Sequence, residues 1–414
     1  MSVNVGVLRP VAAGLLAVLL TNAAVQPAVA APQRAEQWYL DELRIDQAHK
    51  LSTGRGVTVA VVDSGVDATH PDLQGQVLPG GRSYGASGDG RADEDGHGTH
   101  MAGIIAATNA ATDGVDGIAP DAKILPIKIQ KGNGPSSDQA QAQGIRMAVD
   151  GGATVINLSV GGPGAASPEE EQAIAYALER NVVVVASAGN TAKGESAVIS
   201  PANIPGVIAV TGTTRGGAFW PGSVRGPEAV VAAPGDGILN IGPDHGYGWG
   251  DGTSDSAAIV SGIAALIRSK YPDLDAANVI NRIIRTARDA GPAGRDPQFG
   301  FGRIDPVAAL TADVPAVSVN PLLGPASAPT SGAAQAAEDD TFDVTKYGDQ
   351  GGPTDQQVLV IAAGIGLVLV VLLVLAIFLI WNRRRRTREA AVQADASDEL
   401  LDEVSSGGYP RQLR

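Results

Sequence analysis

The stretch VTVAVVDSG, residues 57–65, joins a continuous apolar run to a carboxylate and a glycine turn. Continuous rather than alternating apolarity is typical of a strand that is buried on both faces of a parallel sheet. Similar apolar runs recur along the chain, at 124–129, 155–160, 182–186 and 207–210. We therefore expect a mainly parallel sheet built from these segments.

Helical stretches are expected between the apolar runs. The sequence Ser167-Pro168-Glu169-Glu170 opens one of them, because it places a cap residue, a proline at the first helical position and a glutamate three residues after the cap. Further helices are expected at 137–149, 254–270 and 276–288. The alternation of strand and helix predicts an α/β fold in which the sheet lies between helices.

Chemically active side chains stand near the ends of these runs. Asp63, Ser159 and Asn190 each follow or end an apolar stretch, while His97 and Ser254 each begin a helix after a glycine-flanked loop. In open α/β sheets the reactive groups gather at the carboxyl ends of the strands. A carboxylate, an imidazole and a hydroxyl that converge there have the composition needed for nucleophilic acyl transfer.

Three sequence blocks resemble those of the subtilisin-like serine proteases. VAVVDSGVD at 59–67 is similar to the aspartate block, GHGTHMAG at 96–103 to the histidine block, and GTS at 252–254 to the serine block. Their order along the chain, aspartate then histidine then serine, is also that of subtilisin. The resemblance covers residues 45 to 310 and implies a subtilisin-like three-layer domain with serine endopeptidase activity.

The resemblance also implies a role for individual residues. Asp63 would orient His97, His97 would act as general base and then as general acid, and Ser254 would be the nucleophile. Asn190 matches the asparagine of the family's oxyanion hole. Ser159-Val160-Gly161 matches the segment that binds the substrate backbone as an added strand.

Other readings of these residues stay open at this point. Asp63 alone is compatible with a strand-end turn residue, and Ser256 is a rival nucleophile to Ser254. His97 and His100 stand three residues apart, as metal ligands on one helical face would, but no third ligand with suitable spacing is evident, so no metal site is predicted.

Asp255 departs from the family pattern, which usually has an apolar residue directly after the serine. Its charge suits the first turn of a helix, but it also stands near the place where an oxyanion must form. Asp72 matches a family calcium ligand, and the loop 109–117 has a suitable length to wrap an ion. The alternative is a surface aspartate that caps a turn. No cofactor is predicted, and weak calcium binding is kept as a possibility. His245 receives no role.

The two ends of the chain carry targeting signals. Residues 1–30 hold one charge, an apolar core and Ala28-Val29-Ala30, as a secretory signal peptide does. Residues 358–381 are uncharged, and 24 residues of helix span a hydrocarbon core of about 30 Å. An arginine cluster follows at once and indicates a cytoplasmic C-terminus.

The predicted organisation has six parts. They are a signal peptide at 1–30, an N-terminal extension at 31–54, a peptidase domain at 55–310, a Pro/Ala-rich acidic linker at 311–357, a C-terminal transmembrane helix at 358–381 and a cytoplasmic tail at 382–414. We expect a single-pass cell-membrane protein whose catalytic domain is extracytoplasmic. The apolar face of 38–51, which includes Leu51, is expected to pack against the peptidase domain.

The composition of the chain limits the classes of partner that it is expected to bind. The chain of 414 residues has a formal charge of −14, which argues against nucleic acid as a partner, and it has no cysteine. The short N-terminal extension, the linker and the membrane anchor resemble the mycosins, membrane-anchored subtilases of type VII secretion systems. The absence of cysteine is a mismatch, because disulfides would be expected in such proteins.

The leading functional hypothesis is an endopeptidase that processes a limited set of secreted proteins and is associated with type VII secretion. Its partners would be protein or peptide substrates, the membrane and components of the secretion channel. The alternatives are a mainly structural subunit that stabilises the channel and a broad degradative surface subtilase.

Overall fold

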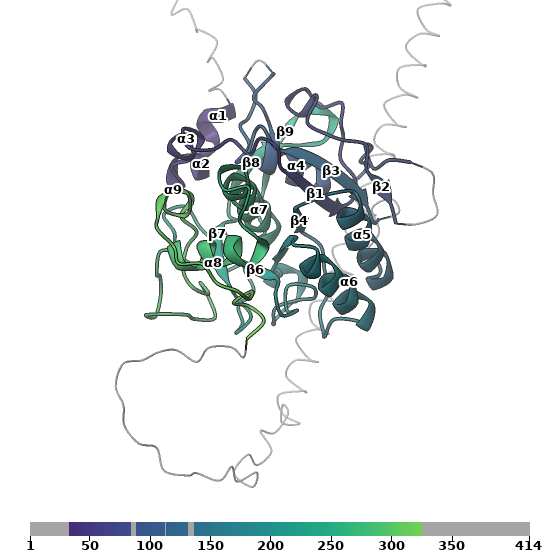
Figure 1. Cartoon of the computed structure of the whole chain (residues 1–414). Helices are drawn as coiled ribbons and strands as arrows, with labels where there is room; N and C mark the ends of the chain where they lie inside the picture. Colours follow the sequence, from purple (N-terminus) through teal and green to yellow (C-terminus); the bar gives the residue numbers. More distant parts are fainter. Residues whose placement is uncertain (1–32, 84–87, 112, 131–135, 325–414) are drawn as a thin grey trace, which may run out of the picture. The chain divides into compact units, whose positions relative to one another are not determined.

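The computed structural model describes residues 33–83, 88–111, 113–130 and 136–324. Its centre is a seven-stranded sheet in the order β2-β3-β1-β4-β5-β6-β7, with all neighbouring strands parallel (Figure 1). A separate antiparallel hairpin joins β8 to β9. The strands are β1 Thr58–Asp63, β2 Gly81–Arg82, β3 Lys123–Lys128, β4 Val155–Leu158, β5 Val183–Ser187, β6 Ile208–Thr213, β7 Val231–Pro234, β8 Ile238–Ile241 and β9 Tyr247–Gly250.

Helices lie on both sides of the sheet (Figure 1). On one side α5 packs beside α6, and on the other α4 packs against α7. The longer helices are α4 His97–Ala106, α5 Asp138–Asp150, α6 Pro168–Glu179, α7 Thr253–Lys270 and α8 Ala276–Thr286, followed by the short α9 Pro306–Thr311. The predicted mainly parallel α/β architecture is therefore confirmed.

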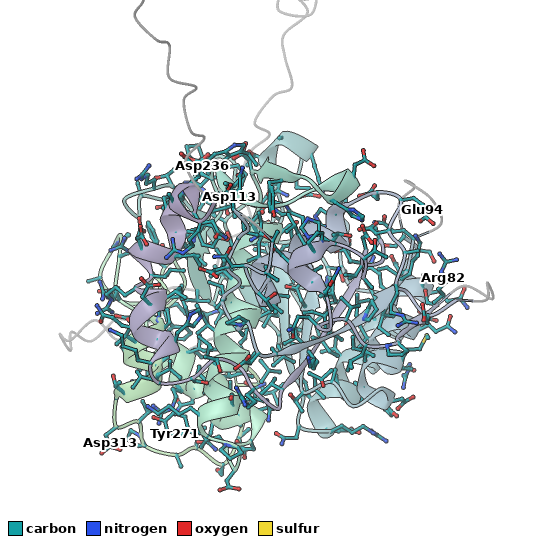
Figure 2. The ribbon with its side chains drawn as sticks, turned by 90° about the horizontal axis from the view of Figure 1, so that it is seen from above. Arg82, Glu94, Asp113, Asp236, Tyr271 and Asp313 are labelled. Atoms are coloured by element: carbon teal, nitrogen blue, oxygen red, sulfur yellow. The ribbon has the colours of Figure 1, made fainter. Side chains whose placement is uncertain are left out.

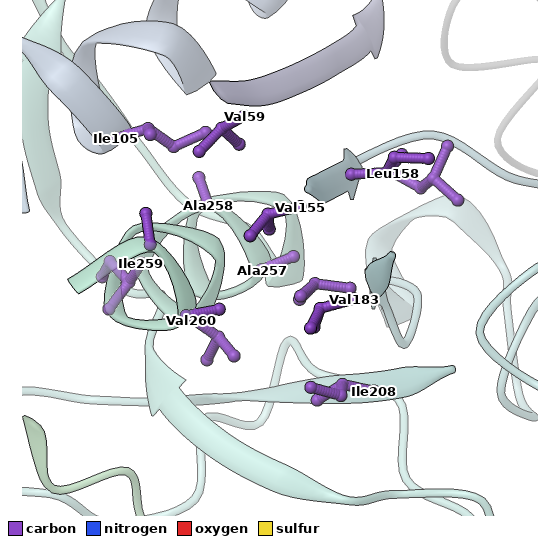
Figure 3. Packing of buried hydrophobic residues seen from close by; sticks show 14 of the residues in the cluster. Val59, Ile105, Val155, Leu158, Val183, Ile208, Ala257, Ala258, Ile259 and Val260 are labelled. Atoms are coloured by element: carbon purple, nitrogen blue, oxygen red, sulfur yellow. The ribbon is translucent and has the colours of Figure 1, made fainter. Parts of the chain in front are cut away.

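Helix α7 runs through the middle of the core, and its residues 253–268 are all buried. Figure 3 shows Ala257, Ala258 and Val260 of this helix beside strand residues such as Val155 and Val183. Small side chains along a buried helix let it approach the sheet closely, and dense packing of this kind holds backbone positions rigidly. The first turn of α7, which carries Ser254, is thereby fixed against the ends of the strands.

Helix α6 begins as the sequence predicts. The Ser167 hydroxyl accepts the Glu170 N–H, and the Glu170 carboxylate accepts the Ser167 N–H, which is a complete capping box with Pro168 at the first helical position. The five predicted strands correspond to β1, β3, β4, β5 and β6 with ends shifted by a few residues. Strands β2 and β7 and the β8–β9 hairpin were not predicted.

The N-terminal extension folds onto the domain as three short helices, α1 Gln33–Glu36, α2 Trp38–Glu42 and α3 Ile45–His49. Its apolar residues from Trp38 to Ala48 join the main core, and Tyr39, Leu40 and Ile45 are almost fully buried. The Trp38 indole N–H donates to the Gly237 carbonyl at 2.7 Å. The expected packing is confirmed except at Leu51, which is 38% exposed because it follows the last turn of α3 on the solvent side.

The predicted linker needs a correction at its start. Residues 312–324 lie against the domain instead of leaving it at 311. Asn278 exchanges two hydrogen bonds with the backbone of Val317, and Asn281 donates to the Pro315 carbonyl at 2.9 Å. Side-chain amides on α8 thus form hydrogen bonds with the backbone of residues 312–324. The composition of this segment alone does not predict an ordered structure.

The described residues contain no helix that is long and apolar enough to cross a membrane. The predicted signal peptide at 1–30, the predicted span at 358–381 and the predicted tail at 382–414 lie outside the described residues. Those three assignments stay predictions.

Candidate active site

Asp63 is the last residue of β1 and is fully buried. Its Oδ1 accepts the Ser64 backbone N–H at 2.7 Å and lies 2.8 Å from His97 Nδ1. A buried carboxylate that is held by a backbone amide has a fixed direction, so it can set the orientation of the imidazole it contacts. The first of the sequence-predicted pairs is therefore present.

His97 is the first residue of α4, and a glycine makes its position possible. A Cβ on Gly98 would come within 2.1 Å of the Gly65 carbonyl, so only glycine lets the helix start approach the β1 turn this closely. Burial lowers the pKa of His97, but the charge of Asp63 and its hydrogen bond, together with the charge of Asp255, raise it to about 9. The ring is thus held as a strong base.

The loop before α4 is anchored from two sides. The Asp93 carboxylate accepts the N–H and the hydroxyl of Thr99 at 2.9 and 2.6 Å. Glu94 contacts Lys128 Nζ at the end of β3, and its other oxygen lies 3.9 Å from Arg82 Nη2. Figure 2 shows Arg82 and Glu94 next to each other at this edge of the domain. These contacts fix where His97 begins its helix.

Ser254 lies in the first turn of α7 and in the same cleft as His97 and Asn190. Its hydroxyl donates to the Ser159 carbonyl at 3.1 Å, so in this state it is not turned toward the imidazole. Catalytic hydrogen bonds in substrate-free enzymes are often long or turned aside and tighten when substrate binds. The structure brings His97 and Ser254 to one cleft, and it joins the buried Asp63 directly to His97.

Asn190 follows β5 and is oriented by the residue before Ser254. Its Oδ1 accepts the Thr253 backbone N–H at 3.0 Å and the Thr253 hydroxyl at 3.3 Å. Because a backbone N–H can only donate, the amide oxygen must face Thr253, and the Nδ2 donors are left for the cleft. The contacts thus orient the Asn190 amide, and its predicted role in an oxyanion hole stays a prediction.

The segment Ser159-Val160-Gly161 follows β4 and borders Ser254. The Ser159 hydroxyl donates to the Ser254 carbonyl at 2.9 Å, which ties this segment to α7. A Cβ on Gly161 would meet the Ser200 carbonyl at 2.1 Å, so this position requires glycine. The segment is suitably placed beside the nucleophile, and its role in binding substrate stays a prediction.

Two alternative readings of the site residues lose support from the contacts. The Ser256 hydroxyl is fully buried and donates to the Ala233 and Pro234 carbonyls at 3.0 Å, so it faces the core and not the cleft. His100 does not share a ligand position with His97: its Nε2 lies 2.9 Å from Asp255 Oδ1, and its Nδ1 lies 2.8 Å from the Ile241 carbonyl.

Asp72 is buried and engages protein donors. Its carboxylate accepts the backbone N–H groups of Ala111 and Val115 at 2.8 and 3.1 Å and the Tyr247 hydroxyl at 3.0 Å. It thus holds the backbone at Ala111 and Val115 in place. In the part of the chain that the structure describes, no group of His, Asp or Glu side chains is arranged to hold a metal. Weak calcium binding, which the sequence left open, stays untested.

The β8–β9 hairpin adds residues that the sequence reading missed. Trp249, on β9, lines the cleft and is 58% exposed. His245, for which no role is predicted, lies between the two strands and contacts Asp67 at 3.3 Å and the Thr69 hydroxyl at 2.8 Å. The short apolar run Ile238-Leu239-Asn240-Ile241, followed by Gly242-Pro243, was the available signal for the hairpin.

A parallel α/β sheet with an aspartate–histidine pair, a helix-starting serine and an asparagine donor in one cleft has the architecture of a subtilisin-like hydrolase. Residues 54–302 match the model of the Subtilase family, Peptidase S8, and the chain belongs to this family. Membership implies a serine-type peptide hydrolase.

The relatives include several mycosins. Mycosin-4 of Mycobacterium tuberculosis is 38% identical over 315 residues, which cover 65% of this chain and 68% of that protein. Mycosin-1 of Mycolicibacterium smegmatis is 36% identical over 332 residues, covering 67% and 73%. The resemblance to the mycosins is therefore confirmed.

Solved structures agree. MycP1 with its N-terminal propeptide removed matches with a TM-score of 0.61 and 36% identity, covering 67% of this chain and 98% of that chain. MycP1 from the ESX-1 type VII secretion system matches with a TM-score of 0.63 and 34% identity, covering 74% and 91%. The chain is thus similar to subtilases that belong to type VII secretion systems.

Proposed function

We propose that this protein is a membrane-anchored, extracytoplasmic serine endopeptidase that cleaves a limited set of secreted proteins and is associated with type VII secretion. Asp63, His97 and Ser254 form its catalytic triad. The observation that carries the proposal is the 2.8 Å contact of the buried Asp63 with His97, which lines one cleft together with Ser254 and Asn190.

The chemistry follows from these positions. Substrate binding turns the Ser254 hydroxyl from the Ser159 carbonyl to His97 Nε2, which takes its proton as the oxygen attacks the scissile carbonyl. Asp63 holds Nδ1 and stabilises the imidazolium that forms. Asn190 Nδ2 and the Ser254 N–H bind the developing oxyanion. His97 then protonates the leaving amine, and water repeats the sequence to release the acid.

Cleavage of a peptide substrate tests the activity. The purified 31–324 segment should hydrolyse a fluorogenic peptide library, and Ser254→Ala should lose almost all activity while it keeps the wild-type melting temperature. Hydrolysis restricted to a few library members supports a processing enzyme, whereas fast turnover of casein and other unfolded proteins favours the broad degradative subtilase. Full activity in Ser254→Ala would contradict the proposed nucleophile.

A role in assembly is the second candidate, and the relatives favour it. One structure, similar at 35% identity, is described as a serine protease that is an essential component of the type VII (ESX-1) secretion system. If the domain here mainly stabilises the channel, deletion of the gene should abolish secretion and Ser254→Ala should restore it. If catalysis is needed, both strains should fail to secrete.

The absence of native cysteine gives a direct test of topology. Single cysteines at Gln172, exposed on α6, and at Ser397, in the predicted tail, would be the only thiols in the chain. A membrane-impermeant maleimide should label Gln172→Cys in whole cells and Ser397→Cys only after lysis. Labelling of both in whole cells would contradict the single-pass arrangement.

A further inference from the structure

The pair formed by His100 and Asp255 has a proton count that its hydrogen bonds determine. His100 Nδ1 faces the Ile241 carbonyl, which can only accept, so this nitrogen carries a hydrogen. Nε2 faces Asp255 Oδ1 at 2.9 Å, and an ionised carboxylate also only accepts. A second proton must therefore lie between Nε2 and Oδ1. With that proton on the ring, the pair is an imidazolium–carboxylate with no net charge.

The pair lies beside the proposed nucleophile, where Asp255 is buried and His100 is partly buried. The side chains of His100 and Asp255 are 14% and 5% exposed. A point beside Gly252, where a Cβ would stand, lies 3.3 Å from Asp255 Oδ2 and 3.5 Å from the Ser254 backbone nitrogen. The carboxylate oxygen therefore lies within 6.8 Å of the backbone nitrogen whose N–H would bind the oxyanion. A buried charge in this position is costly unless it is paired.

We propose that His100 is a positioning residue for the hydrolysis: as an imidazolium it neutralises Asp255, whose charge would otherwise oppose the oxyanion that forms at Ser254. This deepens the proposed function and rests on it. The Asp255 charge also reaches the general base, because it contributes to the raised pKa of His97. Asp63 acts in the same direction on that pKa, and Lys193 acts against it.

Other charged groups line the same cleft. They are Asp95, Lys193 and Asp251, from the loop before α4, the turn after Asn190 and the loop before α7. In the hydrogen bonds and ion pairs of the described chain, none of the three is paired with His100 or Asp255. The imidazolium is therefore the cation in direct contact with Asp255.

The backbone at Gly250 leaves room for the hydrogen bond between His100 and Asp255. A Cβ on Gly250 would lie 2.7 Å from Asp255 Oδ1 and 2.9 Å from His100 Nε2, so the hydrogen bond passes directly over a position that only glycine leaves open. Strand β9 thus closes the pair off from one side.

A double-mutant cycle tests the charge balance. In His100→Asn the amide still donates to the Ile241 carbonyl, but it offers no positive charge to Asp255. We expect kcat to fall by about 10- to 100-fold with a smaller change in KM, because a like charge then stands near the oxyanion. The midpoint of the pH–rate profile should also move upward. His100→Asn/Asp255→Asn, which lacks both charges, should recover most of the lost kcat and move the midpoint back down.

Every result of this cycle either supports or overturns the proposed role of His100. Wild-type kcat in His100→Asn overturns the proposal, and so does a double variant that is as slow as His100→Asn, since a purely structural role gives no rescue by removal of a charge. His49→Asn is the matched control. His49 Nε2 also contacts a carbonyl, that of Ile118 at 3.0 Å, but His49 lies in α3 away from the cleft. The pH–rate profile of this variant should keep the wild-type midpoint.

A second measurement covers a variant that fails to fold. In the ¹⁵N spectrum of the Ser254→Ala protein at neutral pH, both ring nitrogens of His100 should be protonated, and an unprotonated Nε2 would overturn the proposal. The two proposals fail differently. Peptidase activity that survives in Ser254→Ala defeats the proposed function, whereas activity that depends on Ser254 but is indifferent to His100 defeats only this inference.

Discussion

Asn190 and Thr253 are joined by a hydrogen bond in which the Asn190 amide oxygen accepts the Thr253 backbone N–H at 3.0 Å. The bond links the end of the β5 region to the start of α7, and it leaves the Asn190 amide N–H₂ for the cleft. The hydrogen bond thereby orients the Asn190 side chain and leaves its amide N–H groups available to a group in the cleft. This relationship supports the placing of an oxyanion hole next to Ser254.

Replacement of Asn190 tests that placement. Asn190→Ala should lower kcat by about 10²–10³ with little change in KM, because the donor acts mainly on the transition state. Asn320→Ala, which removes an amide that binds the Gly206 carbonyl far from the cleft, serves as the control. A large rise in KM with an unchanged kcat would assign Asn190 to ground-state binding instead.

The pH dependence follows from the state of His97. The general base must be neutral, and its pKa is raised to about 9, so kcat/KM should rise with pH up to and through that region. Asp63→Asn removes a group that raises this pKa and should move the midpoint downward as well as lower the rate. An activity midpoint near pH 6.5 would contradict the coupling of the two side chains.

The contact between Asp63 and His97 also makes the stability of the fold depend on pH. Activity should rise with pH, whereas this contribution to stability should fall. Because the folded-state pKa of His97 lies above its ordinary value of 6.5, the pair stabilises the fold fully below that pH and loses this contribution as pH rises through about 9. The His97 side chain is 36% exposed, so solvent screens the interaction and the loss should be small. His97→Ala should flatten the decrease in melting temperature over this range.

The N-terminal extension should be a lasting part of the fold. Trp38→Ala should lower the free energy of unfolding by about 3–5 kcal/mol, as truncation of a buried aromatic usually does. Leu51→Ala, at an exposed position in the same segment, should cost well under that. Protein isolated from cells should begin near Ala31 and be active. A mature form that starts near Gly54, with an inactive longer form, would identify the extension as an inhibitory propeptide.

Removal of calcium by a chelator tests whether Asp72 binds this ion. Because the Asp72 carboxylate is engaged by Ala111, Val115 and Tyr247, we expect the same melting temperature in chelator and in millimolar calcium. Asp72→Asn should destabilise the protein under both conditions to the same extent. A rise in melting temperature with calcium that disappears in Asp72→Asn would establish the ion site.

The sequence predicted those parts of the structure that local pattern controls. Continuous apolar runs identified β1, β3, β4, β5 and β6, and Ser167 with Glu170 marked the start of α6. The motif blocks placed Asp63, His97 and Ser254 in the site. These features depend on neighbours in the chain, so they can be read from it.

Features that depend on distant contacts were missed. Asp255 looked like an unexplained charge, because its partner His100 is 155 residues away and the pairing needs the fold. Residues 312–324 looked like a linker, because the amides that hold them come from α8. The exposed Trp249 in the cleft was missed since short hairpins such as β8–β9 carry a weak periodic signal.

The most direct test of the account is labelling by a serine-directed phosphonate probe. Ser254 Oγ should attack the phosphorus and displace the leaving group, which adds one stoichiometric mass increment to the intact protein and maps to the peptide that contains Ser254. Ser254→Ala should show no adduct, and His97→Ala should label very slowly. No adduct on the folded wild-type protein, or an equal adduct on Ser254→Ala, would contradict the claim that this cleft is a serine peptidase active site.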